Sequence, residues 1–399
     1  MSSPLASLKI LDFSTLLPGP YATMILADLG AEVLRIEAPG RADLVRMMSP
    51  FDGDGNSSQH AMLNRSKKSL GLNLKAEGSA DIVKKLITEQ GYNIVLEQFR
   101  PGVMDRLGVG YESLKAICPD LIFCSLTGYG QDGPFRDRAG HDINYLALSG
   151  VLSHYGRAGS TPAPLPIQLA DVAAGSNNMV IGLLAAVIRR STTGEGGWVD
   201  ISMHDGSVAW NNIAAANTII GGEKSMPAPE TTMLNGGSFY DLYETSDGKT
   251  LSVGSLEPKF WGGFCAAIGR GDLFKKGTDF RLKNQQSFKD ELREAIKTKT
   301  LAEWTAIFAE IDVCVEPVLT TAEALEHPHT TARNMVIDVP MANGDSQQQI
   351  GTAIKLSNHN PEYKFTGTAL GAHSREILSS LGYSEEEIEA FYANGVTAG

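Results

Sequence analysis

The chain contains little cysteine, with four residues in a length of 399. They are Cys118, Cys124, Cys265 and Cys314, and their spacing fits neither a disulfide framework nor a structural metal site. The first residues lack the basic region and apolar core of an export signal. We therefore expect a cytoplasmic protein with reduced cysteines.

Long apolar runs are also missing. The longest one, Met179 to Ile188, is too short to cross a bilayer and predicts a buried helix. Apolar residues make up 42% of the chain and charged residues 20%, as in ordinary soluble enzymes. The length predicts two or three domains, and we expect no membrane partner.

Positive charge is in deficit, since 34 Lys and Arg face 46 Asp and Glu for a net charge of −12. This balance excludes nucleic acid as a partner, because binding a phosphate polymer needs a basic excess. A small anionic ligand remains compatible with local basic clusters. Such clusters fall within the first 140 residues, at Arg65–Lys68, Lys75, Arg100, Arg106, Arg136 and Arg138.

Several cofactor motifs are absent. The chain has no G-x-G-x-x-G, no Walker loop and no H-E-x-x-H, which disfavours a nicotinamide dehydrogenase, a P-loop enzyme and a zinc protease. The eight histidines lack metal-ligand spacing, and the nearest approach, His327-Pro328-His329, is typical of a turn. We expect neither a metal nor an organic cofactor.

The first half of the chain alternates strand-like and helix-like segments, which predicts a mostly parallel sheet covered by helices. Ligands of such sheets bind at the carboxyl ends of the strands. The predicted strands are 8–13, 32–36, 93–97, 121–126 and 199–203, and the predicted helices are 21–29, 80–89 and 179–190, with a turn at Pro18-Gly19-Pro20.

The pattern changes after about residue 220. Residues 221–238 predict a linker or mobile loop, and Phe239–Gly254 predicts antiparallel strands joined at Ser246-Asp247-Gly248. Helices are predicted near Phe260 and at 288–297 and 301–309, then at 374–382 and 384–393, the last capped by Ser384. The class is α/β, with a large Rossmann-like domain that begins with residues 1–215 and a smaller α+β domain at 225–330.

The segment Gly140–Tyr145 carries His141 and Asp142, and Asp171 follows about thirty residues later. An imidazole and a carboxylate on opposite sides of one carbon can deprotonate one face and reprotonate the other. The pair His141 and Asp171 therefore predicts a racemase-like site, although most such pairs in proteins are structural. Backbone N–H groups near Asp142 are candidate donors to an enolate oxygen.

Several segments together resemble the class III CoA-transferase (CaiB/BaiF-type) family, and within it especially the α-methylacyl-CoA racemases. They span nearly the whole chain: Leu8–Phe13 with Gly19-Pro20, Asp28–Val33, Asn64–Ser69, Arg100–Gly102, Thr127–Gln131, Gly194–Gly196, Val199–Ile201 and Gly371–Leu378. The resemblance implies an interlocked homodimer whose large domain takes back the C-terminal residues 331–399.

The same family holds two chemistries. Resemblance to its transferases makes Asp171 a nucleophile that forms a mixed anhydride, whereas resemblance to its racemases makes it an acid/base group. The racemase-like segments are Gly140–Tyr145, Leu234–Tyr240 and Val253–Pro258, and by resemblance Glu257 pairs with His141. The tetraglycine loop of many transferases is absent.

The favoured function is thus an isomerase of lipid metabolism that epimerises 2-methylacyl-CoA, with a CoA transferase as the alternative. A CoA-binding protein without catalysis is disfavoured, and the acyl group stays open. By resemblance, CoA would contact Leu16, Leu72, Lys75, Gln98, Phe99, Arg106 and Arg138, although the two leucines are equally compatible with a core role. Ala174 and Trp198 depart from the pattern usual in the family and could reshape the acyl pocket.

Overall fold

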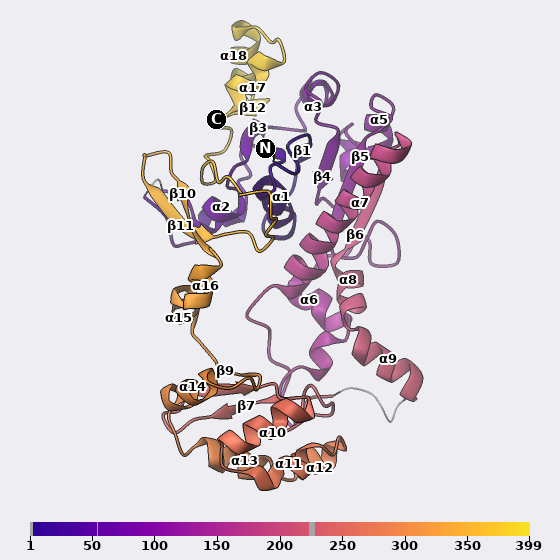
Figure 1. Cartoon of the computed structure of the whole chain (residues 1–399). Helices are drawn as coiled ribbons and strands as arrows, with labels where there is room; N and C mark the ends of the chain where they lie inside the picture. The colour runs from indigo at the N-terminus through magenta and orange to yellow at the C-terminus, as the bar shows by residue number, and fades with distance from the viewer. Residues whose placement is uncertain (1–2, 54, 223–227) are drawn as a thin grey trace. The chain divides into compact units, whose positions relative to one another are not determined.

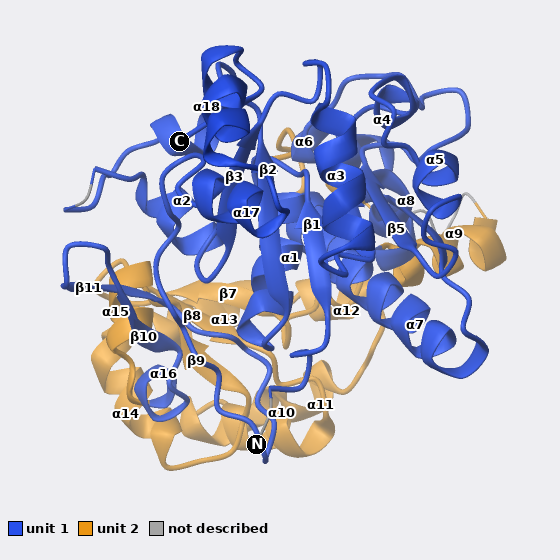
Figure 2. Ribbon diagram, turned by 90° about the horizontal axis from the view of Figure 1, so that it is seen from above, with its two compact units in different colours: residues 1–149, 165–210, 329–399 blue, residues 150–164, 211–328 orange. Residues whose placement is uncertain are grey.

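The computed structural model describes residues 3–53, 55–222 and 228–399, shown along the chain in Figure 1. They form two compact units, coloured separately in Figure 2. Unit 1 contains residues 1–149, 165–210 and 329–399, and unit 2 contains residues 150–164 and 211–328. Part of the predicted linker at 221–238, residues 223–227, lies outside the described residues.

The predicted domain boundary needs one correction, because residues 150–164 and 211–215 belong to unit 2 rather than to the large domain. Ion pairs explain the first of these assignments. Arg157 pairs with Glu230 at 3.0 Å and with Asp241 at 2.7 Å, and both carboxylates belong to unit 2. No sequence pattern near Arg157 predicts this contact between distant segments.

Unit 1 is built on a seven-stranded sheet with the order β12-β3-β2-β1-β4-β5-β6. Strands β3, β2, β1, β4, β5 and β6 run parallel, and the short β12 pairs antiparallel with β3. The bounds are β1 Lys9–Asp12, β2 Glu32–Glu37, β3 Lys68–Leu72, β4 Ile94–Glu97, β5 Ile122–Thr127, β6 Gly197–Ser202 and β12 Thr397–Ala398.

The central strands are buried on both faces. Their sequences are therefore continuous apolar runs rather than an alternation of apolar and polar residues. Leu11 pairs in register with Val95, and both pack in one core cluster together with helix α3 (Ser79–Thr88), as predicted for residues 80–89. The opposite face is covered by α1 (Pro18–Asp28) and α7 (Asn178–Thr193). The predicted α/β class with a mostly parallel sheet is confirmed.

The remaining helices of unit 1 are short. They are η1 Leu44–Met47, α2 Ser58–Leu63, α4 Val103–Arg106, α5 Tyr111–Lys115, α6 Asp142–Leu148, η3 Ala170–Asn177, α8 Met203–Trp210, α17 Ser374–Ser380 and α18 Glu385–Ala393. The hydroxyl of Ser384 accepts the N–H of Glu387 at 3.3 Å, which confirms the predicted cap of α18. The short helix α16 (Pro328–Ala332) begins at Pro328, directly after the C-cap residue His327 of α15.

The Pro18-Gly19-Pro20 turn predicted from the sequence is instead the first turn of α1. Proline suits this position because its fixed φ is helical and its missing N–H would have no acceptor within the helix. The start of α1 thus follows β1 after only a few residues. This places the loop from Asp12 to Pro18 at the carboxyl end of the sheet.

The π-helix η3 runs into α7 without a break, so the continuous helix covers Ala170–Thr193. Its length and apolar composition would allow a membrane crossing, which corrects the shorter extent predicted from the sequence. The core helix of a soluble protein meets the same criteria, and α7 packs against β5 and β6. The prediction that it is buried holds for Met179 and Leu183, whereas Ile181 and Ile188 are exposed.

The C-terminal segment, residues 329–399, returns to unit 1. Thr397 pairs with Leu72 in the sheet, and the buried Arg65 bonds both to Asp28 and to the carbonyl of Ile350. Strands β10 (Val336–Pro340) and β11 (Ser346–Ile350) form a separate antiparallel hairpin. These contacts join segments about 300 residues apart in the sequence.

Unit 2 has its own core under a three-stranded sheet ordered β7-β8-β9. The predicted hairpin is confirmed, because β7 and β8 pair antiparallel around Gly248, whose φ is +73°. The strands are β7 Asp241–Glu244, β8 Thr250–Val253 and β9 Val315–Pro317. The helices of its described residues are η2 Val151–His154, α9 Asn212–Gly221, α10 Pro258–Ala267, η5 Gly271–Leu273, α11 Phe274–Gly277, α12 Leu282–Gln286, α13 Lys289–Ile296, α14 Leu301–Ala309 and α15 Thr321–Glu326.

Candidate active site

The strand order of unit 1 reverses between β1 and β4, since β2 and β3 follow on one side and β5 and β6 on the other. Loops that leave such a switch point diverge and open a crevice at the carboxyl edge, where ligands of α/β sheets bind. Leu16 follows β1 and Gln98 follows β4, so both predicted CoA contacts lie at this edge. The side-chain oxygen of Gln98 accepts the N–H of Gly19 at 3.1 Å and joins the two loops.

Asp142 and Asp171 lie together in unit 1. Asp142 begins α6, and its carboxylate accepts the N–H of Asp171 at 3.0 Å, in the first turn of η3. A second backbone donor, the N–H of Ala170, bonds to the same carboxyl group. The structure therefore brings together two of the four predicted catalytic residues through a direct hydrogen bond.

The electrostatics of this pair favour a proton on Asp171. Burial raises the pKa of the Asp171 carboxyl, and the neighbouring Asp142 raises it further, to about 7. Burial also raises the pKa of Asp142, but the backbone bonds from Asp171 and Ala170 oppose that shift. A carboxyl group with a pKa near neutrality can both accept and donate a proton at physiological pH.

His141 is the residue just before α6 and is exposed, with extended backbone angles. Its N–H donates to the side-chain oxygen of Asn144 at 3.0 Å, while the carbonyl of Gly140 accepts the hydroxyl of Tyr145 at 2.6 Å. These two bonds fix the backbone on both sides of the imidazole. Because α6 packs against η3, His141 and Asp171 are carried by neighbouring elements.

Two glycines make room for the Tyr145 ring. A Cβ at Gly128 or Gly140 would come within 2.6 or 2.7 Å of that ring, so neither position accepts a larger residue without rearrangement. The ring also stacks edge-on against Tyr129 at 5.2 Å between centroids. No role for Tyr145 was predicted from the sequence. The signal that could have found it is its spacing, since a residue four positions after the N-cap residue His141 lies on the same side of the helix as that residue.

Glu257, the predicted partner of His141, belongs to unit 2, whereas His141 belongs to unit 1. It is the exposed residue before Pro258, at the start of α10. Its carboxylate makes no capping bond to that helix. His141, Asp142 and Asp171 thus belong to unit 1, and Glu257 belongs to unit 2.

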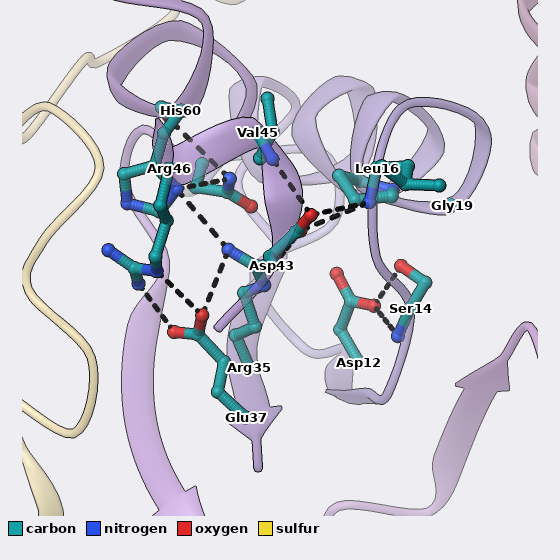
Figure 3. Close-up of polar contacts among 12 residues, drawn as sticks. Asp12, Ser14, Leu16, Gly19, Arg35, Glu37, Asp43, Val45, Arg46 and His60 are labelled. Carbon is teal, nitrogen blue, oxygen red and sulfur yellow. Dashed lines mark hydrogen bonds and ion pairs between the residues drawn. The ribbon is translucent and has the colours of Figure 1, made fainter. Parts of the chain in front are cut away.

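A buried ionic network supports the loop that carries Leu16, as Figure 3 shows. The carboxylate of Asp43 accepts the N–H of Leu16 at 3.0 Å and pairs with Arg35. Leu16 has a φ of +60°, an unusual conformation for a branched side chain that this bond helps to hold. The sequence did not reveal Asp43, because nothing near it in the chain marks a contact 27 residues away.

The same network continues through Glu37, which pairs with both Arg35 and Arg46. Burial alone would raise the pKa of Glu37, but these two guanidinium groups lower it to about 2. Burial and the same two arginines lower the pKa of His60 to about 3, so that imidazole is neutral. The network is thus a fixed, ionised scaffold beneath the loop.

The other predicted CoA contacts differ in environment. Leu72 is completely buried in the core of unit 1, as the alternative interpretation held, and Phe99 packs partly against the same core. Lys75, Arg106 and Arg138 are exposed, and Arg138 lies over the ring of Phe135 at 4.6 Å. Exposed cations at the carboxyl edge suit a phosphate-bearing ligand.

The two departures from the family pattern have separate surroundings. Ala174 is buried against α8, where a Cβ at Gly206 would lie 2.6 Å from its carbonyl oxygen. Trp198 lies at the start of β6, its indole N–H donates to Ser125 at 3.0 Å, and its ring contacts that of Tyr111. Ala174 therefore affects packing inside the η3–α8 contact, and Trp198 connects β6 to Ser125 of β5 through its side chain.

Comparisons with known proteins identify the family of this chain. The model of CoA-transferase family III matches residues 5–374. The chain belongs to this family. It is 36% identical to the human alpha-methylacyl-CoA racemase, over 96% of this chain and 95% of that one. It is 32% identical to an acetyl-CoA:oxalate CoA-transferase of Acetobacter aceti, over 91% and 92% of the two chains.

The fold agrees as well. A CAIB/BAIF family protein from Brucella suis superposes with a TM-score of 0.83 at 28% identity, covering 96% of this chain and all of that one. The relatives of this chain include both a racemase and a CoA-transferase, so family membership by itself does not decide between these two activities.

Among the described residues, no group of three or more His, Cys, Asp or Glu side chains could hold a metal ion.

Proposed function

We propose that this member of CoA-transferase family III is an α-methylacyl-CoA racemase. The observation that carries the proposal is the half-buried Asp171, which bonds through its N–H to the carboxylate of Asp142 and whose own carboxyl has a pKa raised to about 7. A nucleophile that attacks a thioester must be an ionised carboxylate, and a raised pKa lowers its ionised fraction at neutral pH. An acid/base group benefits from the same shift, because it must be able to exist in both forms.

The proposed reaction is a 1,1-proton transfer at the α-carbon. One of the groups His141 and Asp171 removes the α-proton and leaves an enolate of the thioester. The other group delivers its own proton to the opposite face of the same carbon, which restores the C–H bond with inverted configuration. The pair then holds the same number of protons, but the proton has moved from one group to the other. The enzyme is therefore set for the opposite epimer, and exchange with solvent returns the pair to its starting form.

The remaining roles in this proposal follow the family resemblance. Glu257 orients the imidazole of His141, and the backbone N–H at Asp142 donates to the enolate oxygen. Leu16, Lys75, Gln98, Phe99, Arg106 and Arg138 bind the CoA portion, and Leu72 supports them from the core. The proposed reaction needs no metal and no organic cofactor, since acid/base groups suffice for it.

The racemase and the transferase are separated in one experiment. A single epimer of a 2-methylacyl-CoA is incubated in D₂O without an acceptor acid, and its chirality and α-deuterium are followed. We expect epimerisation with incorporation of deuterium, because the enolate is reprotonated from exchangeable groups. CoA transfer to an added carboxylate, with an untouched α-carbon and an acyl-Asp171 adduct trapped by hydroxylamine, would support the transferase instead.

We also propose an interlocked homodimer in the cytoplasm, acting in lipid metabolism. Large apolar side chains are exposed on α9 of unit 2, where Ile219 and Ile220 are 77% and 86% exposed. Ile181 and Ile188 on α7 of unit 1 are exposed too. Apolar surface of this kind is costly in water and fits a second copy of the chain as its cover.

A further inference from the structure

Glu97 is the last residue of β4, at the switch point of the sheet, and is almost completely buried. It lies in register with Ser125 of β5. Burial raises the pKa of its carboxyl, and Asp105 and Asp200 contribute in the same direction, so that it reaches about 7. The charged groups that act on Glu97 are thus carboxylates, and its burial costs stability rather than adding to it.

Its hydrogen bonds point to another role. One carboxyl oxygen accepts the N–H of Phe99 at 2.7 Å, and the hydroxyl of Ser125 bonds to the same carboxyl group. Ser125 in turn accepts the indole N–H of Trp198 at 3.0 Å. Glu97 therefore ties the turn after β4 to strands β5 and β6.

The residues that this turn presents are those expected to meet CoA. Gln98 is held on its other side by the N–H of Gly19, at the start of α1. The turn is thus fixed from two directions, by Glu97 from inside the sheet and by Gly19 from the start of α1. A shift of the Phe99 backbone would move both Gln98 and the Phe99 ring.

We infer that Glu97 is a positioning residue for CoA binding, which fixes the Gln98–Phe99 turn through the N–H of Phe99. The inference rests on the proposed function, because it assumes that a CoA thioester binds at this edge. Glu97 does not touch the reacting carbon in this scheme, so its loss weakens binding and leaves the chemical step intact. A residue kept for stability would behave differently, since replacing a buried acid at this place removes a desolvation cost.

The test compares Glu97→Ala and Glu97→Gln with the wild type at pH 8. Binding of free CoA is measured by calorimetry, KM and kcat by epimerisation, and Tm by thermal unfolding. For Glu97→Ala we expect the Kd for CoA and the KM to rise about tenfold, because one charge-assisted hydrogen bond is lost. The kcat should stay within about twofold of the wild type. Glu97→Gln keeps an oxygen that can accept from Phe99 and should restore part of the affinity.

The matched control is Glu32→Gln at the start of β2, on the amino edge of the same sheet, where the carboxylate accepts the hydroxyl of Tyr92 at 2.5 Å. This variant should bind CoA like the wild type. Unchanged CoA affinity in Glu97→Ala would overturn the inference. A second contrary outcome is that Glu97→Ala and Glu97→Gln lose the same amount of Tm and lose affinity together with it. Failure of the wild type to bind CoA would instead count against the proposed function itself.

Discussion

The N–H of Asp171 donates a hydrogen bond of 3.0 Å to the carboxylate of Asp142, although 29 residues separate them in the sequence. This bond fixes the first turn of the π-helix η3 against the start of α6. Partial burial of Asp171 raises the pKa of its carboxyl, and the negative charge that this contact places beside it raises the pKa further. The contact thus fixes the position of the proposed catalytic acid and adds to the effect of burial on its protonation.

Replacing the imidazole should stop the exchange of one proton. In His141→Ala we expect racemisation to fall by about 10²–10⁴-fold, because the α-proton of one epimer then has no base. CoA binding should persist, since His141 is not among its expected contacts. The measurement is α-proton exchange of each epimer in D₂O, with His359→Ala as a control on another surface segment, and wild-type exchange in His141→Ala would contradict the two-base assignment.

Asp171→Asn should abolish activity and stabilise the fold at high pH. The folded-state pKa lies above the unfolded value of 3.8, so folding favours the protonated form. The contribution to stability is therefore fully present below pH 4 and is lost as the pH rises toward 7. The asparagine variant avoids this loss, which amounts to about 2–4 kcal/mol at pH 8.

Thermal unfolding at pH 4 and pH 8 checks this expectation. The Tm of Asp171→Asn should exceed that of the wild type at pH 8, and the difference should close at pH 4, where both side chains are neutral. A variant less stable than the wild type at pH 8 would contradict the prediction. It would show that the folded protein stabilises the ionised Asp171 carboxylate.

Asp142→Asn should shift the pH dependence of the reaction. The variant keeps an oxygen that can accept the N–H of Asp171 but removes the charge that raises its pKa. The limb of the kcat/KM profile governed by Asp171 should move to lower pH by about one unit. Both epimers must give the same profile, because their equilibrium constant does not change with pH, and a profile that stayed in place would argue that Asp171 does not titrate in the reaction.

CoA affinity should depend on Lys75 and Arg106. Removal of either cation should raise the KM for acyl-CoA about tenfold, because a charge-assisted bond to phosphate is lost. The KM of the variants should also rise less steeply with salt than that of the wild type. A suitable control is Lys84→Ala, which removes a surface cation paired with Asp81. Equal KM values in all three variants would place the nucleotide site elsewhere.

The exposed apolar face of α9 should matter for assembly. We expect Ile220→Asp to weaken self-association, because it places a charge where Ile220 is 86% exposed in the single chain. Sedimentation of the wild type should show a dimer, and the variant should dissociate at a higher protein concentration. A monomeric wild type would refute the dimer, and Glu316→Asp, a conservative change of an exposed residue in β9, serves as the control.

The sequence by itself determined the local elements and the family. Strand-like apolar segments predicted β1, β2, β4 and β5. The predicted helix from Leu301 to Ala309 agrees residue for residue, because these local choices depend on neighbours along the chain. The pattern Gly140–Tyr145 marked His141 and Asp142. Those segments also carried the resemblance that the family match confirms.

The tertiary structure decided what distant residues do to one another. Only the fold shows that Asp142 bonds to Asp171, that Asp43 holds Leu16, and that residues 150–164 join unit 2 through Arg157. Burial and charge at Asp171 and Glu97 follow from such contacts, so their raised pKa values had no trace in the sequence. Local propensity acts over a few residues, whereas electrostatics and packing act between whichever segments the chain brings together.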